Sequence, residues 1–158
     1  MSSQVTINEA TSEVFGNVIF AYTRRQAIED GLLVQLSGPG YEGDQWMPKM
    51  VAEAGIRIPV AMTVEVFNEC VSPTDDSHTL APCQDIEGRL WDVLWMLASN
   101  VRATRGNASE LTYTMRVVPN IPTGSKRTPR PKKVILKAVI GGDDDGSPCI
   151  TIMYPHQD

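Results

Sequence analysis

The chain has 158 residues, of which 42% are hydrophobic and 21% are charged, and its net charge is -5. A chain of this length and composition can bury its own core, so an intrinsically disordered protein is excluded and disulfides or structural metals are unnecessary. The acidic balance disfavours binding of nucleic acid over the whole surface, although a local basic patch remains compatible with it.

The apolar segments and the cysteines indicate the compartment. No apolar run approaches the roughly 20 residues of a membrane helix, and no basic and apolar leader begins the sequence. Cys70, Cys83 and Cys149 are odd in number and widely spaced, so we expect free thiols in a reducing compartment. We therefore expect a cytoplasmic protein that does not contact a membrane.

The beginning of the chain predicts short elements. We expect residues 1–17 to be a loose N-terminal segment, in which residues 8–15 favour one short helix. Residues 18–22 are rich in β-prone side chains and favour a strand. Thr23 is then placed as the N-cap of a short helix that Gly31 ends.

The middle of the chain predicts another strand and a pair of helices. Residues 32–36 favour a strand, and residues 45–54 favour a helix that ends at Gly55. Pro59 is placed in the first turn of a further helix that reaches about Val71. These two helices are expected to pack on each other.

An exposed loop and a strongly apolar helix follow. Residues 72–84 lack periodicity and are rich in proline and polar side chains, which is typical of a surface loop. Residues 85–101 carry leucines at helical spacing, with Trp91 and Trp95 between them. Because apolar side chains cover most of its circumference, we expect this helix to be the central core element, buried on more than one side.

The last third of the chain has the pattern of strands. Residues 111–117 and 133–140 alternate between two faces, and residues 149–154 favour a third strand. Residues 141–146 are turn-forming and acidic, so we expect an antiparallel hairpin with its tip in water. The predicted fold is therefore one α+β domain over residues 18–155, with a C-terminal antiparallel sheet of three to five strands packed against three to four helices.

Four blocks of sequence carry a resemblance to one uncharacterised family, a domain of unknown function. They are YTRRQAIEDG at residues 22–31, AGIRIPVA at 54–61, GRLWDVLWML at 88–97 and ITIM at 150–153. Members of the family that these blocks resemble are encoded on bacterial plasmids, integrative elements and phages. The resemblance therefore implies a genetic context, in a bacterial host cell, and no particular reaction.

The sequence contains no recognisable catalytic or metal-binding constellation. His78 lies in the predicted loop and His156 near the end of the sequence, in segments that we expect to be too mobile to hold a catalytic base against a nucleophile. The three cysteines lack the spacing of zinc ligands, and Cys70 and Cys149 are expected to be small buried side chains. We therefore expect neither a metal nor a cofactor.

A polar cluster follows the strand predicted at residues 18–22, and it has two interpretations. In the first, the cluster is a pocket in which an arginine binds an anion and a carboxylate acts as acid or base. The pocket is formed by Tyr22, Arg24, Arg25, Glu29 and Asp30. In the second, they belong to a capped surface helix on which Arg25 pairs with Glu29. The spacing favours the surface helix and leaves the pocket open.

Residues 124–133, which we call the basic arm, are the sharpest electrostatic feature. Its five basic residues are Lys126, Arg127, Arg130, Lys132 and Lys133. In one interpretation the arm binds phosphates or an acidic partner. In the other it is a solvated connection between strands, and its prolines keep it out of β-pairing. Because no aromatic residues are interleaved to stack on bases, the pattern does not decide between them.

Two functional classes follow from these observations. The first is a non-enzymatic accessory protein of a mobile genetic element that binds a host protein or protein–nucleic acid complex, such as restriction or CRISPR machinery, with the basic arm as a nucleic-acid contact. The second is a small transferase-like enzyme that acts on a nucleotide-like ligand through Arg24, Arg25, Glu29 and Asp30. The missing catalytic constellation favours the first class.

Overall fold

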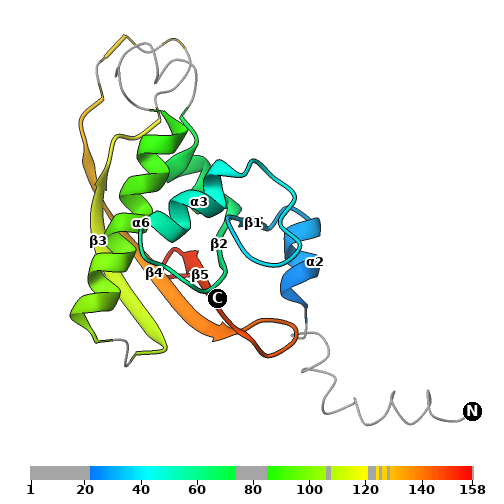
Figure 1. The fold of residues 1–158 in the computed structure, drawn as a ribbon. Helices are drawn as coiled ribbons and strands as arrows, with labels where there is room; N and C mark the ends of the chain where they lie inside the picture. Colours follow the sequence, from blue (N-terminus) through cyan, green and yellow to red (C-terminus); the bar gives the residue numbers. More distant parts are fainter. Residues whose placement is uncertain are drawn as a thin grey trace, which may run out of the picture.

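The computed structural model describes residues 22–73, 85–105, 108–120, 124, 126–127 and 129–157. Its helices and strands build an α+β fold around one mixed five-stranded sheet (Figure 1). In chain order the elements are α2 (Arg24–Glu29), β1 (Leu33–Gln35), α3 (Trp46–Glu53), β2 (Val60–Thr63), α4 (Val64–Val66), the π-helix η1 (Phe67–Val71), α6 (Ile86–Ala103), β3 (Glu110–Val117), β4 (Lys132–Gly142) and β5 (Pro148–Met153).

The predicted fold class is confirmed, and the sheet has one feature that the sequence did not suggest. The strand order is β1-β2-β5-β4-β3, and the C-terminal strands β3, β4 and β5 are antiparallel as expected. β5 also pairs with β2, and this pairing is parallel, so the sheet is mixed. The final strand therefore lies in the middle of the sheet and joins strands from both halves of the chain.

The core lies on one face of this sheet. Alternate residues of β3 and β4 point into it, beginning with Tyr113 and Leu136, and the facing side chains come from α3, α4, η1 and α6. The faces predicted for β4 are confirmed, since Leu136 and Ala138 are fully buried in the core whereas Ile135 is 44% exposed. Helices α3, α4, η1 and α6 thus cover one face, as the sequence predicts, whereas α2 lies on the opposite face, where Arg24 donates to the Thr151 side chain.

The short helix α2 begins as predicted. The Thr23 hydroxyl accepts the Gln26 N–H at 3.0 Å, and the Gln26 side chain accepts the Thr23 N–H, which completes a capping box. β1 and α3 also follow their predictions, and α3 stops before Gly55, whose φ of +90° favours glycine.

The helix predicted to start at Pro59 is wrong in its first turn. Residues 60–63 instead form β2, which pairs with β1 on one side and β5 on the other. Val60, Ala61 and Met62 are fully buried, and a strand covered on both faces is an unbroken apolar run that periodicity cannot separate from a buried helix. Helical structure begins only at Val64, after Thr63 accepts the Val66 N–H as a cap.

α6 confirms the predicted apolar helix, but the expectation that it is buried on more than one side is wrong. The Asp85 carboxylate caps it by accepting the Gly88 N–H at 2.7 Å. Leu90, Leu94 and Leu97 are fully buried, whereas Trp95 is 47% exposed. The helix is thus amphipathic, with Trp95 on the outer side and Trp91 partly buried against the core.

The hairpin between β4 and β5 is also confirmed, and its acidic tip has a structural role. Asp144 is exposed, yet its carboxylate accepts the backbone N–H groups of Arg24 and Arg25 at 2.8 and 3.0 Å. The tip therefore satisfies free donors at the start of α2. The predictions for residues 1–17, for residues 18–21 of the first strand and for residues 74–84 of the loop, with His78 and Cys83, lie outside the described residues.

Candidate functional site

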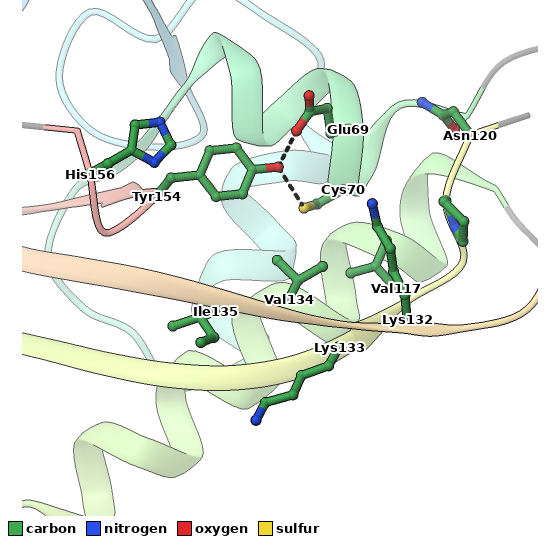
Figure 2. Close-up of a pocket in the computed structure, with 11 residues that line it drawn as sticks. Glu69, Cys70, Val117, Asn120, Lys132, Lys133, Val134, Ile135, Tyr154 and His156 are labelled. Carbon is green, nitrogen blue, oxygen red and sulfur yellow. Dashed lines mark hydrogen bonds between the residues drawn. The ribbon is translucent and has the colours of Figure 1, made fainter. Parts of the chain in front are cut away.

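A cleft of about 630 Å³ lies at the end of the sheet where β3 stops and β4 starts (Figure 2). It opens because β5 ends at Met153, opposite Lys137, whereas β4 continues back to Lys132. Four segments wall the cleft: η1, the end of β3 with the residues that follow it, the first residues of β4, and the turn that follows β5. Its chemically distinctive lining residues are Glu69, Cys70, Lys132, Lys133, Tyr154 and His156.

Tyr154 spans the cleft from the end of β5 to η1. Its hydroxyl donates to the Glu69 carboxylate and lies 3.7 Å from the Cys70 sulfur (Figure 2). Burial and the bond to Glu69 raise the pKa of Tyr154 above its ordinary value, so the phenol stays protonated at neutral pH and keeps donating. The ring is therefore held in one orientation.

The turn after β5 is anchored, so the expectation that His156 lies in a mobile segment is wrong. The Gln157 side chain accepts the Thr63 hydroxyl and the Tyr154 N–H, both at 2.9 Å, and donates to Glu65 at 2.9 Å. The His156 imidazole stacks on the Tyr154 ring, with centroids 5.7 Å apart and planes 8° apart. This wall of the cleft is thus preorganised.

A buried cation, Arg89, lies behind the cleft and stabilises its wall. Arg89 is 5% exposed and donates to the Asn120 side chain at 3.0 Å and to the Val118 carbonyl at 2.8 Å. Asn120 in turn donates to the carbonyls of Asn68 and Ser72 at 2.8 and 3.1 Å. These bonds tie α6, the end of β3 and η1 together and fix the shape of the cleft.

The two cysteines that the structure describes, Cys70 and Cys149, do not supply a nucleophile. Burial is the main cause that raises the pKa of the Cys70 thiol, and it also raises that of Cys149. Both side chains are buried, at 2% and 3% exposure, as the sequence predicts. A protonated and inaccessible thiol reacts slowly, so Cys70 is poorly placed to act as a nucleophile in the cleft.

The C-terminal end of the basic arm lines this cleft. Of the arm, the structure describes residues 124, 126–127 and 129–133. Lys132 and Lys133 belong to β4 and pair with Val117 and Arg116, so this end is not kept out of β-pairing. The described basic side chains of the arm are exposed at Lys126, Arg127, Arg130, Lys132 and Lys133.

The structure does not gather the polar cluster around α2 into one pocket. The Arg24 guanidinium donates to Thr151 and to the Ile150 carbonyl of β5, which fastens α2 to the sheet. Arg25 donates to the Pro39 carbonyl at 3.1 Å rather than pairing with Glu29.

Of the remaining members of that cluster, Tyr22 lines a cleft together with Arg24, whereas Glu29 and Asp30 do not. Tyr22 donates to the Asp30 carboxylate, and both side chains are exposed. Arg24 lines two clefts of about 200 and 770 Å³, whereas Glu29 and Asp30 line neither of them. The predicted arginines and the predicted carboxylates of Glu29 and Asp30 therefore do not line one cleft.

The part of the chain that the structure describes contains no group of three or more acidic, histidine or cysteine side chains that could hold a metal ion. Of its helices, none combines the length and apolar character that crossing a bilayer would require.

Sequence patterns pointed to Lys132 and Lys133 but missed most of the cleft. Glu69 and Cys70 are separated from Tyr154 by more than eighty positions, and no local pattern connects them. The one available signal was the position of Tyr154 at the end of a predicted strand and of His156 just after it, where side chains at a sheet end converge.

Fold and site together define a small α+β domain with a mixed sheet and an open cleft at its basic end. A model described as a family of unknown function, DUF6573, matches residues 12–158. The chain belongs to this family, which confirms the resemblance to an uncharacterised family. No curated protein and no solved structure matches the chain significantly.

Proposed function

We propose that this protein is a non-enzymatic binding protein that attaches to a negatively charged partner, a host protein or a protein–nucleic acid complex. The contact is the basic end of its sheet, formed by Arg116 and the basic residues of the arm. The observation that carries the proposal is the pairing of Arg116 directly with Lys133 across β3 and β4.

Like charges that face each other across two strands destabilise a sheet. Both side chains are exposed on the outer face, and the nearest acid along β3 is Glu110 at its far end. Six residues of strand span roughly 20 Å, which exceeds the Debye length of about 8 Å at physiological salt. β4 contains no acidic residue. A negatively charged partner would relieve this repulsion, and electrostatic complementarity of that kind selects partners.

The geometry supports binding over the alternative of a nucleotide-handling enzyme. Arg24 is engaged by β5, and the carboxylates of Glu29 and Asp30 lie outside the clefts that Arg24 lines. In the cleft at the basic end, the Cys70 thiol is protonated and the Tyr154 phenol is already donating. These groups can position a bound segment but are poorly suited to take or give protons.

The proposal extends to a setting, the cytoplasm of a bacterial host. The resemblance to proteins of plasmids, integrative elements and phages supports an accessory protein of a mobile element that blocks a defence complex. Expression of the chain in a restriction-proficient or CRISPR-proficient host should then raise the plating efficiency of a sensitive phage. Unchanged plating on both kinds of host would contradict this part of the proposal.

Binding through the basic end can be tested with heparin as a generic polyanion. The double substitution Arg116→Gln and Lys133→Gln should lower the salt concentration at which the protein leaves a heparin column, because each lost contact reduces counterion release. The same substitution should raise the melting temperature, because it removes the cross-strand repulsion. Retention and melting are measured on the same preparations.

A matched control removes two charges at the other end of the sheet. Arg57 precedes β2 and Arg105 follows α6, and both are exposed. Arg57→Gln with Arg105→Gln changes the net charge equally and should leave heparin retention nearly unchanged. Equal losses in the two double variants would show that retention reflects total charge, and an unretained wild-type protein would remove the proposal.

A further inference from the structure

We infer that the partner is a protein that adds an acidic, extended segment to the free edge of β4, as an extra strand in the cleft. The inference rests on the function proposed above and identifies its partner. The free edge consists of residues 132–136, which pair with β3 on one side but extend beyond the end of β5 on the other.

Backbone geometry shows which groups this edge presents. Ile140 donates its N–H to Ser109 at 2.8 Å, toward the β3 side, and alternate residues of an antiparallel strand point to the same neighbour. The N–H and C=O groups of Lys133 and Ile135 therefore point away from β3, into the space that β5 leaves. Within the described part of the chain no strand pairs with them there. Such a row of donors and acceptors is a template for strand addition.

The cleft has room and rigid walls for an added strand. Its volume of about 630 Å³ lies beside this edge, and Figure 2 shows Val134 and Ile135 across it from Tyr154. Tyr154 is fixed by Glu69, and the following turn is fixed by Gln157, so the far wall cannot close over the edge without breaking those bonds. Ile135 is 44% exposed and offers an apolar contact to an incoming side chain.

Charge selects the occupant. Lys132 and Lys133 lie on the edge itself and Arg116 lies beside Lys133, so a basic or neutral strand gains little there. Lysines at a sheet edge normally prevent uncontrolled pairing, and a second copy of this chain would bring its own lysines opposite them. A strand with acidic side chains on the face of Lys133 and Arg116 satisfies both the backbone and the charges.

The experiment uses the full chain and a fluorescent eight-residue peptide that alternates acidic and β-branched residues. Fluorescence anisotropy should show binding that weakens in the Arg116→Gln and Lys133→Gln variant but not in the Arg57→Gln and Arg105→Gln control. The peptide is also made with its alternate amides N-methylated, on one edge or on the other. Methylation of the edge that faces β4 should weaken binding about tenfold or more, because several backbone hydrogen bonds are lost, and methylation of the opposite edge should not.

Three results would overturn the inference. Equal affinities of the two methylated peptides would show contact by side chains alone. Binding of a single-stranded oligonucleotide without binding of the peptide would identify nucleic acid as the partner. If the protein is retained on heparin but does not bind the peptide, strand addition is contradicted. The proposed function is then unaffected. If the wild-type protein is not retained on heparin at all, that result would instead contradict the proposed function itself.

Discussion

At the scale of single residues, Arg89 is the most consequential side chain. It is a buried cation whose guanidinium holds Asn120 and the Val118 carbonyl, and burial lowers its pKa from the ordinary value. Guanidinium groups remain charged even when the pKa falls, because the starting value is so high. Asn120 in turn holds two carbonyls near η1, so the rear wall of the cleft depends on this one cation.

Replacement of Arg89 tests that dependence. Arg89→Met keeps much of the apolar volume but leaves the Asn120 oxygen and the Val118 carbonyl without this donor, so unfolding should become easier by about 2–4 kcal/mol. Urea denaturation followed by circular dichroism measures the change. The exposed Arg57→Met serves as control and should stay within about 0.5 kcal/mol. A loss below about 1 kcal/mol at Arg89 would show that the network reorganises without it.

At the scale of elements, α6 has two unlike faces. Its leucines are fully buried against the sheet, while Trp95 is exposed and stacks on the partly buried Trp91, with ring centroids 5.8 Å apart. The Arg102 guanidinium lies 5.7 Å from the Trp95 ring, in cation–π geometry, and also donates to the Ala54 carbonyl at the end of α3. Aromatic stacking therefore stabilises the helix surface but does not form the core.

A pair of alanine substitutions separates the two faces. Leu94→Ala should cost about 2–5 kcal/mol, because it leaves a cavity under α6. Trp95→Ala removes the larger side chain, yet it should cost only about 1 kcal/mol, since stacking and cation–π contacts are modest at an exposed site. Chemical denaturation measures both. A cost at Trp95 that equals or exceeds the cost at Leu94 would contradict this assignment of faces.

At the scale of the whole molecule, β5 joins the two parts of the sheet. It is the only strand that links the β1–β2 pair to the β3–β4 pair among the described strands. Its partner residues in β2 lie about ninety positions earlier in the chain, as the pairing of Val60 with Ile150 shows. The two parts of the sheet are therefore one cooperative unit, assembled through contacts that are distant in sequence.

Local signals explain which elements could be predicted from the sequence. α2 has a complete capping box, α6 has leucines at helical spacing, and β3 and β4 alternate between two faces. β2 could not be separated from a helix, because both its faces are covered and its residues do not alternate. The parallel pairing of β2 with β5 has no local signature at all.

The cleft was predictable only where its chemistry is concentrated in one segment. The basic arm identified Lys132 and Lys133 by charge alone. The free edge of β4 depends on where β5 ends, and the position of Tyr154 against Glu69 depends on the turn held by Gln157. These are consequences of tertiary structure, which neither composition nor periodicity encodes.

Residues of opposite charge lie at the start of β4 and just beyond its end, and this arrangement has a consequence for the rate of encounter. Lys132 and Lys133 begin the strand, and three aspartates follow its last residue, Gly142. Eleven residues of strand separate these ends by roughly 35 Å, which gives the molecule an electric dipole along the strand. An approaching polyanion is repelled by one end and drawn to the other, so collisions are turned toward the basic end before any contact forms. Added salt should therefore slow association much more than it speeds dissociation.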